Sequence, residues 1–189
     1  MKNLLSANIK SRNILLLFLA TMTIYVIMLV ITIPKLMMFS EGKEILDMMP
    51  AGYNKAYVTE LMTRLSVDGR FYYLTRQLPL DFIYPGLFAY TYALIFIFFL
   101  RKIGKHGTSW KFIAYLPVLA GLADYFENIC IISILKSFPN VSPILVQFSS
   151  TASVVKASST TIYFISLTIL LIAFGIYRIR DRGLTGQAK

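Results

Sequence analysis

The chain has 189 residues, enough for one compact domain, and 57% of them are hydrophobic. A typical soluble domain is roughly 45–50% apolar, so this excess, with a mean hydropathy of +0.65, indicates contact with lipid. The formal net charge of +10 does not predict nucleic-acid binding, because the lysines and arginines lie in short clusters beside apolar runs. A single cysteine, Cys130, excludes an intramolecular disulfide and a cysteine-rich zinc site.

Four apolar runs predict transmembrane helices, because each is long enough to cross about 30 Å of hydrocarbon. They cover approximately residues 14–33, 82–100, 112–135 and 154–177. The first run is longer than the apolar part of a cleavable signal and is followed by no small-x-small cleavage site, so we expect it to be retained. We therefore predict an all-α membrane protein with a single transmembrane domain over residues 1–189, built as a four-helix bundle.

The distribution of basic residues predicts the orientation, because short cytoplasmic loops are rich in Lys and Arg. The connection of residues 34–79 mixes basic and acidic side chains, whereas the opposite side of the predicted spans is almost purely basic. That side carries Lys2, Lys10, Arg12, Arg101, Lys102, Lys105, Lys111, Arg178, Arg180, Asp181, Arg182 and Lys189. We expect a multi-pass protein of the plasma (inner) membrane with both termini in the cytoplasm.

The connection between the first two predicted spans, about residues 35–79, is expected to form an extracytoplasmic helical segment. Apolar residues recur there at helical spacing, at Tyr57, Val58, Leu61, Met62 and Leu65. We expect the amphipathic helix to end at Asp68-Gly69, because glycine tolerates the left-handed conformation that ends many helices. The aromatic and basic run of residues 70–74 is expected to lie on the membrane surface, as a cap over the bundle.

The third predicted span carries three polar side chains on one helix face. Asp124, Glu127 and Asn128 stand at positions i, i+3 and i+4. A charged side chain at membrane depth costs about 2.5–3.5 kcal/mol on insertion scales, so such residues usually face the protein interior. Two neighbouring carboxylates are not expected to ionise together, which suits acid–base chemistry, a proton relay or a hard-cation site. Asp124 and Glu127 are therefore the candidate catalytic residues.

Other polar side chains are expected to join this cluster. Asp81 opens the second predicted span and Lys156 the fourth, both at the outer end, so the cluster is predicted in the outer half of the membrane. Lys156, with Arg70 or Arg76, is expected to neutralise carboxylates, because charges in hydrocarbon usually pair. The predicted ligand-binding set is Asp81, Asp124, Glu127, Asn128, Lys156, Arg70, Tyr84 and Tyr125.

Several enzyme classes lack their required residues. The chain has no GxSxG, no HExxH and no GxxxxGK[ST] sequence. His106 is the only histidine, and it lies in a predicted loop away from the carboxylates, so a metal bound at the carboxylates would be calcium, magnesium or manganese. We predict no bound metal and no cofactor.

Three motifs occur in order along the chain: Gly69-Arg70-x-x-Tyr73, Leu80-Asp81 with Tyr84-Pro85, and Ala123-Asp124-x-x-Glu127-Asn128. Together they resemble a group of small bacterial four-helix integral membrane proteins without an assigned activity. The resemblance covers most of the chain after about Met49 and includes Lys156. It implies the fold and a membrane location, and no substrate. A looser likeness to sterol-isomerase-type four-helix proteins lacks that pattern's histidine and tryptophan within the spans, since Trp110 lies at a span edge.

Three functions stay open at this point. The polar cluster can hold the bundle together or pair with another membrane protein, as in a structural or partner subunit, because polar side chains join membrane helices. It can bind a lipid or another apolar small molecule, or act on one as a membrane-embedded acid–base enzyme. It can also serve a proton- or cation-coupled carrier, for which four helices suggest a homodimer. The partners expected are therefore membrane lipid, an apolar small molecule, a second copy or another membrane protein, and no nucleic acid.

Overall fold

The computed structural model describes residues 10–105 and 107–186, and the side chains as far as residue 180. The described residues do not include Lys2, His106 and Lys189, which were used in the predictions from sequence, nor the side chains of Asp181 and Arg182. Helices make up 86% of the protein, and no strand occurs in the part that is described. Four helices are long and apolar enough to cross a membrane, which confirms the all-α class and the four predicted long apolar helices.

The first long helix extends well past the predicted residues 14–33. It runs over Ser11–Phe39 as α2 (Ser11–Ile27), a π-helical turn η1 (Met28–Thr32) and α3 (Ile33–Phe39). Pro34 does not end it, because the proline stands in the first turn of α3, where a missing N–H is tolerated best. Only 17% of an 18-residue apolar stretch of this helix is buried, so most of the helix faces outward.

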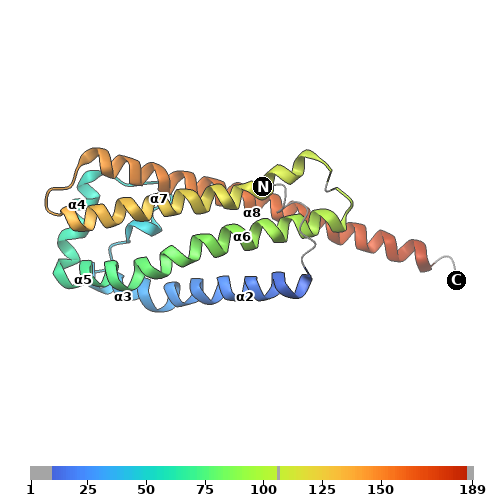
Figure 1. Ribbon diagram of the computed structural model, residues 1–189, viewed down its shortest axis with the longest axis horizontal. Coiled ribbons are helices and arrows are strands. Elements are labelled where there is room, and N and C mark those ends of the chain that lie inside the picture. The colour runs from blue at the N-terminus through green and yellow to red at the C-terminus, as the bar shows by residue number, and fades with distance from the viewer. Residues whose placement is uncertain (1–9, 106, 187–189) are drawn as a thin grey trace.

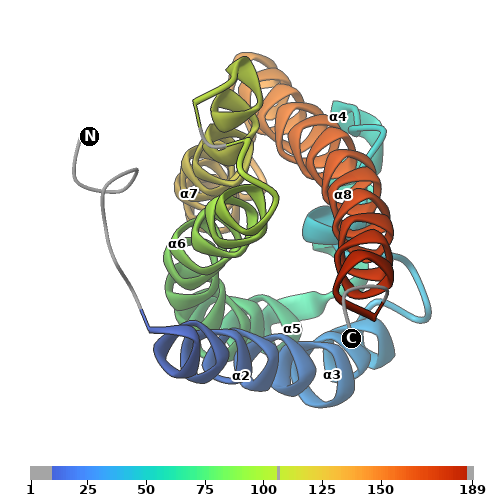
Figure 2. The ribbon, with the colours of Figure 1, turned by 90° about the vertical axis from the view of Figure 1, so that its right-hand side faces the viewer.

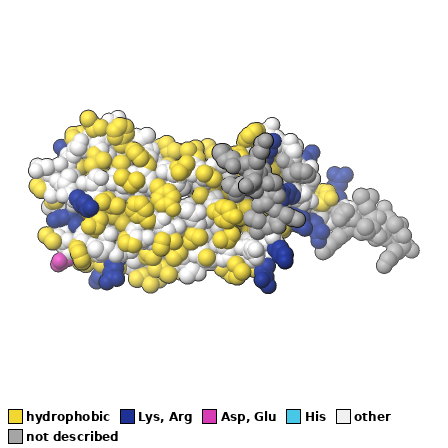
Figure 3. All heavy atoms as spheres, viewed as in Figure 1, with side chains coloured by type: hydrophobic (Ala, Val, Ile, Leu, Met, Phe, Trp, Pro, Cys, Tyr) yellow, Lys and Arg dark blue, Asp and Glu magenta, His cyan; other side chains and the backbone are white. Residues whose placement is uncertain are grey.

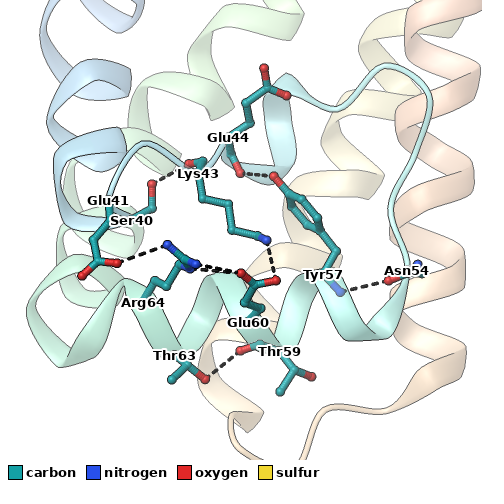
Figure 4. A network of polar contacts seen from close by, with 10 residues as sticks. All are labelled: Ser40, Glu41, Lys43, Glu44, Asn54, Tyr57, Thr59, Glu60, Thr63 and Arg64. Carbon is teal, nitrogen blue, oxygen red and sulfur yellow. Dashed lines mark hydrogen bonds and ion pairs between the residues drawn. The ribbon is translucent and has the colours of Figure 1, made fainter.

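Residues 40–65 form a cap at one end of the bundle. They contain η2 (Leu46–Met48) and α4 (Lys55–Arg64), whose first turn is capped by Asn54 accepting a hydrogen bond from the backbone N–H of Tyr57 at 2.9 Å. The apolar side of α4 is buried, which confirms the predicted amphipathic helix. Its outer side carries an ion-pair network, with Glu60 bound by Lys43 at 2.6 Å and by Arg64 at 3.1 Å (Figure 4).

The predicted helix stop at Gly69 is wrong. The helix is interrupted at Ser66 instead, where φ is 56°, and Gly69 lies buried inside the next helix, α5 (Ser66–Tyr72). A Cβ at Gly69 would come within 2.9 Å of the Cβ of Phe39, so glycine is needed here for close approach of α3 and α5. Residues 70–74 are likewise part of a continuous helix over Ser66–Lys102 and not a separate surface segment.

That continuous second helix comprises α5, a π-helical turn η3 (Tyr73–Gln77) and α6 (Leu78–Lys102). After η4 (Ser109–Tyr115), α7 (Leu116–Ser137) and α8 (Pro143–Gly186) complete the bundle. Figure 1 shows α2, α6, α7 and α8 side by side along the long axis, with α4 and α5 gathered at the cap end and α8 extending beyond the other end. The face in Figure 3 is largely apolar over its middle, and lysines and arginines gather toward its two ends.

The helices pack in a curved row. α2 packs on α6, α6 on α7 and α7 on α8, whereas α2 and α8 make no extensive contact within the described residues (Figure 2). The α6–α7 contact is close, because a Cβ at Gly121 would lie 2.8 Å from the backbone oxygen of Pro85. The row therefore leaves the first and last helices facing each other across an interior space.

Two site residues lie farther from their helix ends than the apolar runs indicated. α8 begins at Pro143 and the second long helix at Ser66, so Lys156 and Asp81 stand several turns inside their helices. The apolar runs begin only where the last polar residues end, which is why the sequence placed both at the start of a span. Their depth in the membrane stays a prediction.

Candidate functional site

A cavity of about 440 Å³ lies in the interior space between the first helix, α6, α7 and α8, directly under the cap. Its apolar and aromatic lining includes Tyr25, Met28, Ile33, Met48, Tyr84 and Phe88. Its polar lining includes Asp47, Gln77, Asp81, Asp124, Ser153 and Lys156. The cavity thus combines an apolar wall with a concentration of carboxylates.

Lys156 of α8 binds both acids that the sequence singled out on α7. Its Nζ lies 3.1 Å from Asp124 Oδ1 and 2.6 Å from Glu127 Oε2. Glu127 is fully buried and Asp124 is 6% exposed. Because the two acids are one turn apart on the same face, a single lysine from the neighbouring helix reaches both. The structure therefore brings together charges that the sequence expected to pair, while Asp81 lines the same cavity without an ion pair among the described residues.

The cap is attached to this ion pair through Tyr53. The Tyr53 hydroxyl donates to Glu127 Oε1 at 3.3 Å and shares a 2.6 Å hydrogen bond with the hydroxyl of Ser149. Burial raises the pKa of the Tyr53 hydroxyl, and the charge of Glu127 adds to the shift, so the hydroxyl keeps the proton that it donates. The same stretch is held by Ser153, whose hydroxyl donates to the backbone oxygen of Met49 at 3.0 Å.

Gly52 makes this attachment possible. Its φ is +82°, and a Cβ there would lie 2.5 Å from the Ser150 hydroxyl oxygen. That hydroxyl accepts a hydrogen bond from the backbone N–H of Tyr53 at 2.8 Å. Glycine is therefore required twice, for the left-handed turn and for the close approach of the cap to α8.

Asp47 enters the cavity from the cap. Tyr73 donates to its Oδ2 at 2.9 Å, while its Oδ1 is sealed from solvent without a partner among the described residues. Burial, together with the charges of Glu127 and Asp124, raises the pKa of Asp47 to about 7 against the lowering effects of Lys156 and the Tyr73 hydrogen bond. Asp47 therefore changes charge close to neutral pH.

Asp81 of α6 faces the cavity with one carboxylate oxygen unsatisfied. The residue is only 3% exposed, and its Oδ2 has no hydrogen-bond partner in the part of the chain described. Its backbone oxygen accepts a hydrogen bond from Asn128 Nδ2 at 2.8 Å. That oxygen would normally bond the N–H of residue 85, which is proline and has none. Asn128 thus supplies the donor that Pro85 lacks.

Gln77 adds a free donor. Its side-chain oxygen accepts a hydrogen bond from the Thr32 hydroxyl, and its Nε2 is buried without a partner in the described chain. Thr32 ends η1 and Gln77 ends η3, so the two π-helical turns meet through these side chains. Such turns occur frequently at functional sites, because the extra residue redirects side chains.

The predicted ligand-binding residues divide into two groups. Asp81, Asp124, Lys156 and Tyr84 line the cavity, and Glu127 lies behind them as a partner of Lys156. The remaining three do not line it, namely Asn128, Arg70 and Tyr125.

Each of these three has another contact. Asn128 binds the Asp81 carbonyl, as described. Arg70 donates to the backbone oxygen of Met62 at 2.6 Å and lies over the ring of Phe138 at 4.8 Å. The ring of Tyr125 packs against Phe82 at 6.0 Å between centroids.

Sequence reasoning missed Asp47, Tyr53, Tyr73 and Gln77. All four belong to the connection that was expected to lie on the membrane surface, outside the bundle. One signal was present, because Asp47 is the only charged residue in the otherwise apolar stretch of residues 45–50. Because this connection was predicted to lie on the membrane surface, Asp47 was not assigned to the site.

No group of three or more His, Cys, Asp or Glu side chains among the described residues converges so as to hold a metal ion. Comparison of the chain with protein families, with curated proteins and with solved structures finds no match. The resemblance drawn from the three motifs therefore stays an expectation. The fold and the site are consistent with a multi-pass membrane protein, and they define a four-helix bundle with an acidic cavity under a cap.

Proposed function

We propose that the protein binds an amphiphilic, lipid-like molecule in the cavity, with the polar end at the carboxylates and the apolar part between α2 and α8. The observation that carries this proposal is the set of buried atoms without a partner, Asp47 Oδ1, Asp81 Oδ2 and Gln77 Nε2, in a cavity with aromatic and aliphatic walls. A buried polar atom without a hydrogen bond costs about 1–3 kcal/mol. A ligand that satisfies these atoms recovers that free energy.

The size and shape of the cavity support this proposal. Small-molecule sites usually enclose about 300–1,000 Å³, and the cavity of about 440 Å³ lies in that range. Its lining includes Tyr25 and Met28 from the first helix and Ala157 and Thr161 from α8, which do not pack extensively on each other. An alkyl chain can therefore leave the cavity between these helices and continue among membrane lipids.

We further propose that the cap lies outside the plasma (inner) membrane and that both termini are cytoplasmic. Support comes from the helix ends opposite the cap, where Arg101 and Lys102 close α6 and Arg178 and Arg180 follow the apolar part of α8. The cap residues Asp47, Met48 and Pro50 line the cavity, so the ligand is taken from the outer leaflet or the outer side.

A second candidate function is acid–base catalysis on the same lipid-like molecule. It is favoured by Asp47, whose pKa of about 7 lies where a general acid or base works best. A structural or partner subunit and a proton-coupled carrier both differ from the proposed binder, because neither requires a molecule in the cavity.

The test is the lipid that copurifies with the protein. Ala157 lines the cavity, and Ala157→Phe fills part of it, whereas Ala20→Phe adds the same bulk on the exposed side of α2. We expect native mass spectrometry and lipid extraction to find a bound amphiphile in the wild-type protein and in Ala20→Phe, and at least a fivefold loss in Ala157→Phe. Equal lipid content in all three proteins would overturn the proposal.

A further inference from the structure

The cavity has more acidic than basic groups around it. Four carboxylates lie in or directly behind the lining, namely Asp47, Asp81, Asp124 and Glu127, and Lys156 is the one basic residue in the lining within the described chain. Lys156 is already engaged by Asp124 and Glu127. Two basic residues of the cap end are engaged elsewhere, because Lys43 binds Glu60 and Arg70 binds the Met62 carbonyl.

The two carboxyl groups left without a cation, Asp47 and Asp81, come from different elements that line the cavity. Asp47 belongs to the cap and Asp81 to α6, and each has one oxygen that is sealed from solvent and lacks a hydrogen-bond donor. The side chain of Asp81 is more than nine-tenths buried, so bulk solvent does not reach that oxygen. These two carboxyl oxygens are hydrogen-bond acceptors without a donor, and a cationic donor satisfies both best.

A bare metal ion fits this place poorly. Hard cations take six or more oxygen ligands, whereas the described side chains include no group of three acids or other metal-binding residues. A protonated amine has up to three N–H donors and needs only two or three acceptors. The neighbouring aromatic rings favour the same group, because Tyr25 and Tyr84 stack at 5.7 Å between centroids at the cavity wall, where the methylene groups beside an ammonium pack well.

Gln77 specifies a second feature of the ligand. Its Nε2 is a donor, fully buried and without a partner among the described residues, so the ligand must present an oxygen acceptor to it. The other end of the amide contacts the Thr32 hydroxyl, which leaves Nε2 as the end without a partner. A hydroxyl or carbonyl oxygen close to the amine meets this requirement.

Resting on the proposed function, we infer that the ligand is a cationic amphiphile, whose protonated amine is held between Asp47 and Asp81 and whose neighbouring hydroxyl or carbonyl oxygen accepts from Gln77. Lys156 takes no part in holding it and keeps Asp124 and Glu127 occupied. The inference names a class of polar end group, an amino alcohol or an aminoacyl group on an alkyl chain. Anionic phospholipids are disfavoured at this site by the same carboxylates.

The experiment uses three probes of equal chain length with the full chain in lipid nanodiscs. N-dodecylethanolamine carries an amine and a hydroxyl, dodecanediol is neutral, and dodecanoic acid is anionic. Empty nanodiscs correct for partition into lipid. We expect the amine to bind at least about tenfold more tightly than the diol, as one charge-assisted hydrogen bond provides, and the acid to bind most weakly.

Three variants separate the inference from the proposed function. Asp81→Asn should reduce amine binding to the level of the diol, and the exposed Asp68→Asn, which removes the same charge outside the cavity, should leave the tenfold preference unchanged. If the wild type binds diol or acid as well as amine while Ala157→Phe abolishes binding, the inference fails and the proposed function stands. If Ala157→Phe leaves binding of all three probes unchanged, both fail. Should Asp81→Asn not fold, the preference of the wild type for amine over diol still decides the inference.

Discussion

The two sides of the cavity satisfy their charges in different ways. On the α7–α8 side, Lys156, Asp124 and Glu127 form a closed set of ion pairs that Tyr53 attaches to the cap. On the α6 and cap side, Asp81 and Asp47 each keep an oxygen without a partner among the described residues. A buried charge with a partner is part of the fold, and a buried charge without one is free to interact with a ligand. The difference suggests that the first side stabilises the bundle and the second side recognises a ligand.

Removing Lys156 should have the largest effect. We expect Lys156→Met to lower the free energy of unfolding by about 3–5 kcal/mol, because it leaves two buried carboxylates without a cation. The triple variant with Asp124→Asn and Glu127→Gln should recover most of the loss. Thermal unfolding in detergent measures both. A Lys156→Met protein as stable as the wild type would remove the contrast between the two sides.

Asn128 should have the next largest effect. Asn128→Ala leaves the Asp81 carbonyl without a donor, and we expect a loss of about 1–3 kcal/mol in the free energy of unfolding. Adding Pro85→Ala restores a backbone N–H that can reach that carbonyl, so the double variant should lose less than the sum of the two single variants. Strict additivity in this double-mutant cycle would show that Asn128 acts in another way.

Asp81→Asn tests the recognition side by the same measurement. The substitution keeps the shape and removes an unpaired charge, so we expect the protein without ligand to be unchanged or more stable by about 1 kcal/mol. Asp124→Asn, which removes a carboxylate of the same size from the paired side, should lower stability under the same conditions. A loss of stability in both variants would mean that the two sides do not differ.

The pH dependence tests the recognition side through Asp47. The pKa of Asp47 is raised from 3.8 to about 7, so the folded protein holds a proton that the unfolded chain has released between these values. Stability should therefore rise as pH falls through about 7 and level off near 4. Of the groups that face Asp47, only Tyr73 and Lys156 favour its charged form, and Asp124, Glu127 and Asp81 oppose it.

The measurement is thermal unfolding from pH 8 to pH 5 without ligand. We expect Asp47→Asn to lose the part of the rise that Asp47 contributes, and the exposed Asp68→Asn to keep it. An unchanged pH profile in Asp47→Asn would contradict the prediction. An amine ligand should lower the pKa of Asp47, because a cation favours the carboxylate, and should shift the rise to lower pH.

Apolar run length was enough to predict the four long helices, since hydrocarbon thickness limits how short a spanning helix can be. The spacing of Asp124 and Glu127 was enough to place them on one face, because the helical repeat is fixed. Helix ends were predicted less well. The first helix continues through Pro34 and the second begins at Ser66, since polar residues and π-helical turns can extend a helix that a hydropathy pattern ends.

The amino-acid sequence by itself thus determined the helical class and the shared helix face of Asp124 and Glu127, because both depend on periods and lengths within a single segment. Only the tertiary structure decided that Lys156 binds Asp124 and Glu127, that Asn128 serves the carbonyl freed by Pro85, and that Asp47 lies beneath the cap. These contacts join segments far apart in the chain. Their formation depends on how the cap folds back over the bundle, and the amphipathic pattern of α4 records only which side of that one helix is buried.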